Sequence, residues 1–385
     1  MKMNDAFLAS MREAMHLLQT AGPMEATEAI QRALRQQSPT SAAVAPAAPM
    51  PAQVVERLLT HAQAPARTVD VVSDVPETIP ATSRSTRALR PDSTGASPHK
   101  AGHFSQRTFV NQAGSRSYKL YLPAGQRAEP MPLVVMLHGC TQDADDFAAG
   151  TQMNALADKL GFVVLYPIQA AENNPSKCWN WFRPGDQQAG KGEPSIIAGM
   201  AREVIASHGI DARRVYVAGL SAGGAMAAVL IQGYPELFAA AGVHSGLPAG
   251  SAHDLPSALG AMQGGKGIGR SKPDAMPSTT PRRPMIVFHG DADHTVHPLN
   301  GSRLVAPFEK GQARREKERK KVAAGHDYTR LSITTPAGVD AEYWTIHGAG
   351  HAWAGGNRQG TYTDPKGPDA SAEMLRFFLA HPLPG

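Results

Sequence analysis

One segment of the chain has the residue types and spacing of a nucleophilic turn. The apolar run Val215–Ala218 leads into residues 219–223, which read Gly-Leu-Ser-Ala-Gly, and a helical pattern follows at Gly223–Tyr234. In such a strand–turn–helix unit the serine occupies a sharp bend with strained backbone angles, and the flanking glycines avoid clashes with neighbouring chain. We therefore predict that Ser221 is the nucleophile of an acyl-transfer reaction.

A general base and an acid that orients it are expected later in the chain, because this type of site follows the order Ser, acid, His. The loop after a predicted strand holds two candidate acids. Asp293, three residues before Val296, is the favoured acid, and Asp291 is expected to shape the turn. A later glycine-rich loop holds two histidines. His351, deeper in that loop, is predicted to be the base, and His347, at the strand end, a structural residue.

The negative charge that develops on a carbonyl oxygen during acyl transfer needs two fixed N–H donors, the oxyanion hole. One donor is assigned to Ala222, directly after the predicted nucleophile. The other is expected in the loop that follows the buried run Leu133–Leu137 and that also contains His138. The backbone N–H groups of Cys140 and Thr141 are alternatives for this second donor.

Tryptophans gather near the expected site, although aromatic residues make up only 6% of the chain. Trp179 and Trp181 belong to one short aromatic segment, and Trp353 stands two residues after the predicted base. We expect these three side chains to contribute to a substrate cleft. Core packing is the alternative, because tryptophan is often buried.

A metal site is the alternative interpretation of the polar side chains around the predicted acid. His289, Asp291, Asp293, His294 and His297 lie close together in the sequence. A catalytic metal site requires clustered ligands and an open coordination position. The serine turn makes such a site unnecessary, so we expect no metal and no cofactor.

The surrounding pattern indicates a sheet that can position these loops. Apolar runs alternate with helical patterns, which predicts a mainly parallel sheet with helices on both faces, as in the α/β-hydrolase fold. The expected strands are His103–Val110, Arg116–Leu122, Leu133–Leu137, Phe162–Tyr166, Val215–Ala218, Ala239–Val243, Met285–Phe288 and Ala341–Ile346. The expected helices are Met153–Leu160, Ser195–His208, Gly223–Tyr234 and Ala370–Ala380.

Composition divides the 385 residues into three parts. Residues 1–36 are predicted to form short amphipathic helices, residues 37–101 an Ala-, Pro- and Ser-rich disordered linker, and residues 102–385 the catalytic domain. Within that domain, residues 248–283 and 306–327 interrupt the alternation of strands and helices and are expected to be surface insertions. The second of them contains a basic run, which we interpret as a solvated helix face.

Charge and hydropathy exclude several classes of protein. The net charge is +5 and much of it comes from the one basic run, so we expect no nucleic-acid partner. No apolar stretch approaches the ~20 residues of a membrane-spanning helix, and the N-terminus lacks the uninterrupted apolar region of a signal peptide. We therefore expect no transmembrane segment and a cytoplasmic location, with secretion without a recognisable signal peptide as the alternative.

Taken together, the motifs resemble those of the polyhydroxybutyrate (PHB) depolymerase family of esterases. They are His-Gly-Cys-Thr-Gln at 138–142, Cys-Trp-Asn-Trp at 178–181, the serine turn at 219–224, His-Gly-Asp-Ala-Asp at 289–293 and Gly-His-Ala-Trp at 350–353. The resemblance implies ester hydrolysis, with Ser221, Asp293 and His351 as the catalytic triad. It also implies a disulfide between Cys140 and Cys178, where the residues alone leave either one bridge or two buried thiols.

The resemblance implies an ester hydrolase more firmly than it implies one substrate, because the family includes polyester depolymerases as well as feruloyl and acetylxylan esterases. We expect a short-chain polyhydroxyalkanoate polyester or its oligomers, with a feruloyl- or acetylxylan-type carbohydrate ester as the alternative. The helices of residues 1–36 are candidates for binding a polymer granule surface. A second alternative is a granule- or partner-binding protein whose hydrolase domain is degenerate.

Overall fold

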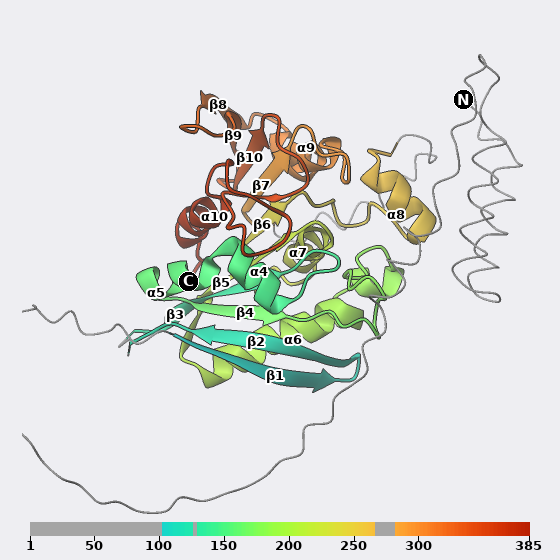
Figure 1. Ribbon diagram of the computed structural model, residues 1–385, viewed down its shortest axis with the longest axis vertical. Helices are drawn as coiled ribbons and strands as arrows, with labels where there is room; N and C mark the ends of the chain where they lie inside the picture. Colours follow the sequence, from blue (N-terminus) through green and yellow to red (C-terminus); the bar gives the residue numbers. More distant parts are fainter. Residues whose placement is uncertain (1–101, 126–128, 266–281) are drawn as a thin grey trace, which may run out of the picture. The chain divides into compact units, whose positions relative to one another are not determined.

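The computed structural model describes residues 102–125, 129–265 and 282–385, so the predictions for residues 1–36 and 37–101 lie outside the described residues. A ten-stranded sheet runs through the described part in the order β1-β2-β4-β3-β5-β6-β7-β10-β9-β8 (Figure 1). Its strands are β1 (His103–Asn111), β2 (Gly114–Leu122), β3 (Met131–Leu137), β4 (Val163–Pro167), β5 (Ile210–Leu220), β6 (Ala240–His244), β7 (Met285–Gly290), β8 (Arg314–Lys320), β9 (Tyr328–Thr334) and β10 (Asp340–Ile346).

The centre of the sheet is parallel, from β4 through β3, β5, β6 and β7 to β10. Antiparallel strands extend it at both edges, with β1 and β2 beside β4 and with β9 and β8 beside β10. Every residue of β4 and of β7 is buried, as expected where helices cover both faces of a parallel sheet. The prediction of a mainly parallel sheet with helices on both faces is confirmed.

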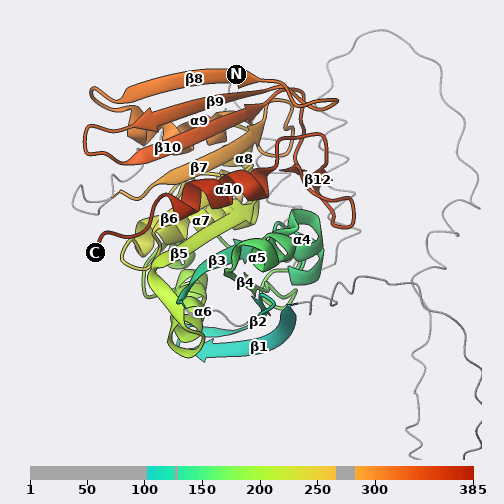
Figure 2. The same ribbon diagram turned by 90° about the vertical axis from the view of Figure 1, so that its left-hand side faces the viewer.

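Two layers of helices cover the sheet, because alternate residues of its strands point to opposite faces. The face that carries Leu133 and Val135 packs against α6 (Gly192–Ser207), α7 (Ala222–Gly233), α8 (Leu255–Met262), α9 (Leu299–Val305) and the short η2 (Ala306–Glu309). The face that carries Val134 and Met136 packs against α4 (Ala144–Thr151), α5 (Met153–Leu160) and α10 (Ala370–Leu379) (Figure 2). A further short helix, η1 (Pro184–Gln187), precedes α6.

The basic run within residues 306–327 forms a strand, so its interpretation as a helix face is wrong. This strand, β8, pairs antiparallel with β9 at the outer edge of the sheet (Figure 2). Its sequence, Arg-Arg-Glu-Lys-Glu-Arg-Lys, is charged at every position and almost entirely exposed. Because both of its faces are polar, no period of two residues reveals it in the sequence. Charged side chains along an edge strand also oppose pairing with another chain.

The other predicted insertion, residues 248–283, contains α8, and residues 266–281 lie outside the described residues. A reciprocal cap begins α8. The side chain of Asp254 accepts the N–H of Ser257 at 2.8 Å, and the side chain of Ser257 accepts the N–H of Asp254 at 3.0 Å. Among the described residues, none of the helices has the length and apolar character needed to cross a membrane.

The start of α10 depends on one capping side chain. Oδ1 of Asp369 accepts the N–H of Ala372 at 2.9 Å, and the helix then buries Met374 and Phe378 against the sheet. We expect Asp369→Ala to lower the free energy of unfolding by about 1 kcal/mol, because an N–H group of the first turn loses its acceptor. Asp369→Asn keeps an oxygen acceptor and serves as the control. Urea unfolding measures both variants, and an alanine variant as stable as the wild type would contradict this role.

Candidate active site

Ser221 lies at the sharp turn between β5 and α7, with backbone angles φ 57° and ψ −118°. A positive φ at a non-glycine residue is strained and persists where the surroundings impose it. A Cβ atom on Gly219 would overlap the backbone of Gly223, and a Cβ atom on Gly223 would overlap the carbonyl oxygen of Leu137. The N–H of Ser221 donates to the carbonyl oxygen of His244 at 2.9 Å. Both glycines of the motif are therefore required by space, and β6 holds the turn.

Asp293 lies in the loop after β7, with its side chain fully buried. Its Oδ1 accepts the N–H groups of Thr295 at 2.9 Å and Val296 at 2.8 Å, and its Oδ2 lies 2.7 Å from Nδ1 of His351. Although burial opposes ionisation, hydrogen bonds from His289, His351 and Val296 hold the pKa of Asp293 well below its usual value. An ionised Asp293 keeps the proton of the His351 ring on Nδ1, which leaves Nε2 as the acceptor.

Asp291 and His347, the acid and the histidine that were expected to be structural, form a separate pair. Oδ2 of Asp291 lies 2.8 Å from Nδ1 of His347, and its Oδ1 accepts the N–H of Gly348 at 2.6 Å. Nε2 of His347 lies 2.8 Å from the hydroxyl of Thr329 in β9. This pair is partly exposed, whereas Asp293 is not. The structure thus joins Asp291 to the end of β10, in the turn-shaping position that its place in the sequence suggests.

The loops after β5, β7 and β10 converge at the carboxyl edge of the sheet. The N–H of Ala292, beside the predicted acid, donates to the carbonyl oxygen of Ala349 at 3.1 Å and so ties the acid loop to the base loop. Two residues after the predicted base, the ring of Trp353 stacks on that of His244, with 5.3 Å between the ring centroids. The carbonyl oxygen of His244 in turn holds Ser221, so the loops after β5 and β10 share the support of His244, and the loop after β7 is tied to them through Ala349.

The loop after β3 distinguishes between the two candidates for the second oxyanion donor. The N–H of Thr141 donates to the carbonyl oxygen of Ser176 at 2.7 Å and is therefore already engaged. The backbone hydrogen bonds of the described residues include none from the N–H groups of Cys140 or Ala222. Ala222 is the first residue of α7, where backbone N–H groups have no partner within the helix. Cys140 therefore fits the donor role, and Thr141 does not.

A disulfide and a buried imidazole brace this loop. Cys140 and Cys178, 38 residues apart in the sequence, are joined by a disulfide, and closing a loop of that length contributes about 4 kcal/mol in the chain-entropy account. The ring of His138 donates from Nδ1 to the carbonyl oxygen of Gly139 at 2.7 Å, and its Nε2 accepts the N–H of Gln169 at 3.1 Å. The loop is therefore fixed before any ligand binds.

A buried carboxylate, Glu193 at the start of α6, supports the segment that carries Cys178, and sequence reasoning missed it. Its oxygens accept the backbone N–H of Asn180 at 2.7 Å and the side-chain amide of Asn180 at 2.6 Å. The guanidinium of Arg116 lies 3.3 Å from the carboxylate, and burial raises the pKa of Glu193. A lone glutamate near a helix start resembles any surface glutamate, so no sequence signal marks this role.

The three tryptophans lie in the core, which favours the core-packing alternative over the prediction that they line a cleft. Trp179 and Trp353 are buried, and Trp181 is 6% exposed. Trp353 donates from Nε1 to the hydroxyl of Ser371 at 3.0 Å, which anchors the base loop to α10. Burial of a large aromatic surface stabilises a protein core. These rings therefore support the site from beneath rather than face solvent.

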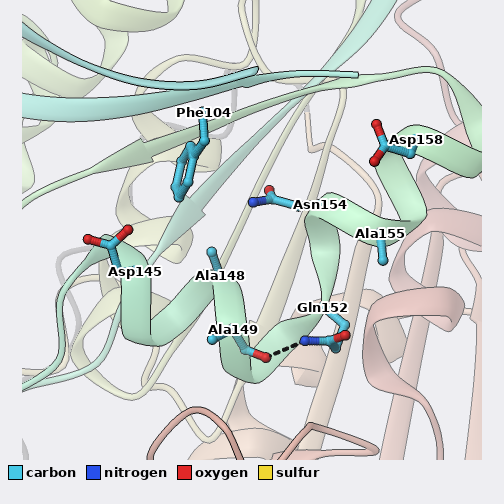
Figure 3. Close-up of a pocket in the computed structure, with 8 residues that line it drawn as sticks. All are labelled: Phe104, Asp145, Ala148, Ala149, Gln152, Asn154, Ala155 and Asp158. Atoms are coloured by element: carbon cyan, nitrogen blue, oxygen red, sulfur yellow. Dashed lines mark hydrogen bonds between the residues drawn. The ribbon is translucent and has the colours of Figure 1, made fainter. Parts of the chain in front are cut away.

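A cavity of about 400 Å³ lies between β1, α4 and α5 (Figure 3). It is lined by Phe104, Asp145, Ala148, Ala149, Gln152, Asn154, Ala155 and Asp158. None of these residues was predicted to act in the chemistry. The converging loops, rather than this cavity, therefore define the candidate active site.

The side chains considered as metal ligands have separate partners. Asp293 and Asp291 hold different imidazoles, and Nδ1 of His297 accepts the N–H of Leu299 at 3.1 Å. His294 is exposed. Within the described ranges, no three His, Cys, Asp or Glu side chains form a group that could hold a metal ion.

Known proteins resemble this chain over its central part. The family model described as "Esterase PHB depolymerase" matches residues 116–316. Poly(3-hydroxyalkanoate) depolymerase C of Paucimonas lemoignei is 37% identical over 209 residues, which are 52% of this chain and 49% of that protein. Feruloyl esterase B of Neurospora crassa is 35% identical over 200 residues, 49% of this chain and 67% of that protein. The chain thus spans about half the length of the depolymerase that it matches.

A solved structure shares the fold. The acetyl xylan esterase from Aspergillus awamori superposes with a TM-score of 0.53 at 22% sequence identity, covering 71% of this chain and 98% of that one. At this identity the likeness concerns the fold alone, and it agrees with the α/β-hydrolase architecture predicted from the alternation of strands and helices.

Two buried imidazoles make the stability of the fold depend on pH. Burial lowers the pKa of His138 to about 4 and that of His244 to about 3, from an ordinary value of 6.5. The unfolded chain therefore binds more protons than the folded chain between pH 6.5 and about 4, and the free energy of unfolding falls as the pH is lowered through this window. We expect His138→Gln to reduce this slope.

Urea unfolding between pH 7 and 4.5 measures the slope, and the variant His294→Gln, which changes an exposed histidine, is the control. The control should keep the wild-type slope. If His138→Gln also keeps it, buried His138 does not take up a proton on unfolding, and the assignment of a lowered pKa is wrong.

Proposed function

The chain belongs to the esterase PHB depolymerase family, and we propose that it hydrolyses carboxylic esters through an acyl-enzyme formed on Ser221. One observation carries the proposal: the buried Asp293–His351 pair, with 2.7 Å between Oδ2 and Nδ1, lies in loops that converge on the Ser221 turn. A nucleophile on a strained turn beside an oriented imidazole is the arrangement that acyl transfer requires.

In the first step, the hydroxyl oxygen of Ser221 attacks the ester carbonyl carbon while Nε2 of His351 takes its proton. Asp293 stabilises the imidazolium, and the N–H groups of Ala222 and Cys140 donate to the oxyanion. Collapse of the tetrahedral intermediate breaks the ester bond, and the departing alcohol takes the proton from His351. Among the described residues, no hydrogen bond joins Ser221 to His351 before a substrate binds, and such contacts commonly tighten in the substrate complex.

In the second step, water attacks the acyl group on Ser221 and gives a proton to His351. Collapse of the second intermediate releases the carboxylic acid, and His351 returns the proton to the serine oxygen. Each proton transfer uses the same ring nitrogen, so the orientation imposed by Asp293 serves both steps. Side chains and backbone groups of this chain carry out every step, and the mechanism requires no cofactor or metal.

The substrate that we propose is a short-chain polyhydroxyalkanoate polyester or its oligomers. The relative that is 37% identical has the name of a poly(3-hydroxyalkanoate) depolymerase, which supports this choice. A feruloyl- or acetylxylan-type carbohydrate ester is the second candidate, because other relatives have the names of feruloyl and acetylxylan esterases at 35% and 32% identity. Binding of a polymer granule by residues 1–36 remains a prediction outside the described residues.

The disulfide bears on where the protein acts. Disulfides persist in oxidising compartments and are rare in the cytosol. The bond between Cys140 and Cys178 braces the loop that holds the proposed oxyanion donor, so its reduction would loosen a part of the site. We therefore infer that the domain acts in an oxidising compartment, in preference to the cytoplasmic location expected from the sequence.

Matched substitutions at the two carboxylates test the proposed triad. We expect Asp293→Asn to lower kcat by about 10⁴-fold, because the amide no longer fixes the productive tautomer of His351. Asp291→Asn changes the exposed pair at the end of β10 and should reduce kcat less than tenfold, a bound of about 1.4 kcal/mol. Ser221→Ala should abolish turnover. Hydrolysis of p-nitrophenyl butyrate measures all three variants, and equal losses in the two aspartate variants would contradict the assignment.

A substrate panel tests the proposed class of ester. We expect the wild-type chain to release hydroxyacid products from amorphous polyhydroxybutyrate and from soluble hydroxybutyrate oligomers, and to be at least tenfold less active on methyl ferulate, since about 1.4 kcal/mol of discrimination is within reach of one pocket contact. Product analysis by chromatography measures both reactions. Preferential hydrolysis of methyl ferulate or of acetylated xylan would favour the carbohydrate-ester alternative.

A further inference from the structure

Tyr362 combines an exposed ring with a strained backbone. It precedes β12 (Thr363–Asp364), which pairs in parallel with β11 (Trp353–Ala354). Its φ is 51°, a conformation that is uncommon for any non-glycine residue and an outlier for a bulky one. The residue is 47% exposed, so burial of the ring does not explain the strain. A strained residue of this kind persists where its neighbours impose it, and such residues cluster at functional sites.

The neighbours of Tyr362 impose this conformation from both sides. Before it, Thr361 is fastened to α4, since its N–H and hydroxyl donate to the carboxylate of Asp146 at 2.8 and 2.7 Å. Its carbonyl oxygen also accepts the side-chain amide of Gln142 at 3.1 Å. The carbonyl oxygen of Tyr362 accepts the N–H of Trp353 at 2.7 Å, which fastens the other side. Figure 2 shows β12 beside α4, in agreement with these bonds.

The ring of Tyr362 is thereby directed to the loop that carries the proposed oxyanion donor. Its hydroxyl lies 3.3 Å from the hydroxyl of Thr141, the residue after Cys140. Thr141 is itself exposed and strained, with φ 65°, and its hydroxyl donates to the carbonyl oxygen of Cys140 at 2.6 Å. Two strained, exposed residues therefore meet between the oxyanion loop and the loop that carries the proposed base.

We propose that Tyr362 is a specificity-determining residue whose ring contacts the apolar part of a bound ester, with the Thr141 hydroxyl setting the position of that ring. The inference rests on the proposed function, because the contact is made to an ester held at Ser221. It differs from the earlier expectation that tryptophans form the cleft. The tryptophan rings are buried, whereas Tyr362 is an exposed aromatic residue bonded to both catalytic loops.

The test compares three p-nitrophenyl esters, acetate, butyrate and octanoate, in steady-state assays of the full-length chain. We expect Tyr362→Ala to raise KM for butyrate and octanoate about tenfold, as the loss of one aromatic contact would. The rise should be smaller for acetate, which offers less apolar surface, and kcat should change little for all three esters. Tyr362→Phe keeps the ring and loses only the hydroxyl that meets Thr141, so KM for butyrate and octanoate should rise by less than in Tyr362→Ala and by about as much as in Thr141→Val.

Two further variants separate specificity from backbone strain. Gln152, between α4 and α5, also has a positive φ, 56°, so Gln152→Ala is the matched control and should leave KM unchanged for every ester. Thr141→Val removes the hydroxyl that positions the ring and keeps the branched shape. Thr141→Val should raise KM for butyrate and octanoate more than for acetate, as Tyr362→Ala does, but each rise should be smaller than in Tyr362→Ala. Thermal unfolding shows whether each variant is folded.

The outcomes distinguish this inference from the proposed function. If the wild type hydrolyses none of the three esters, both are wrong. If the wild type is active and folded Tyr362→Ala has unchanged KM for butyrate and octanoate, only the inference is overturned. An equal rise in KM for all three esters overturns the inference as well, because a ring that contacts the apolar part of the ester must discriminate between acyl chains of different length. Should Tyr362→Ala fail to fold, unchanged KM values in folded Thr141→Val overturn the inference.

Discussion

The close contact between the serine turn and the end of β3 is the constraint on which the rest of the site depends. Gly223 lies so near the carbonyl oxygen of Leu137 that no side chain fits between them, and Ser221 is held at a φ of 57° by its bond to His244. The same contact brings the loop of Cys140 beside the first N–H groups of α7. The proposed nucleophile and the proposed oxyanion donors are thus positioned by one steric requirement rather than by separate interactions.

Buried imidazoles support this edge of the sheet. His138 accepts a backbone N–H under the oxyanion loop, His244 accepts the N–H of Ala354 under the base loop, and His289 lies between Val296 and the buried acid. Imidazole suits the places of His138 and His244 because one ring supplies both a donor and an acceptor on an aromatic frame that packs against apolar neighbours, whereas Nδ1 of His289 is buried without a partner among the described residues. The ring nitrogens thereby give hydrogen-bond partners to backbone groups of these loops that would otherwise be buried unpaired.

Much of this site could be predicted from the sequence, because its strongest requirements leave local marks. The glycines around Ser221 stand where a side chain would clash with neighbouring backbone. The spacing of three residues between Asp293 and Val296 is that of a turn in which a backbone N–H donates to the carboxylate. What could not be predicted depends on partners far along the chain. Strand β8 is polar on both faces and is defined only by pairing with β9, and Glu193 gains its role from residues 13 and 77 positions away. For the tryptophans the sequence left core and cleft open, because composition cannot distinguish a buried ring from an exposed one.

The disulfide also changes the connectivity of the molecule. The segment between Cys140 and Cys178 becomes a closed covalent ring that contains α4, α5 and β4. A protease that cut one peptide bond inside this ring would leave both new ends attached to the same molecule. The oxyanion loop would then survive a nick that, in a reduced chain, would separate the polypeptide into two pieces held together by packing alone.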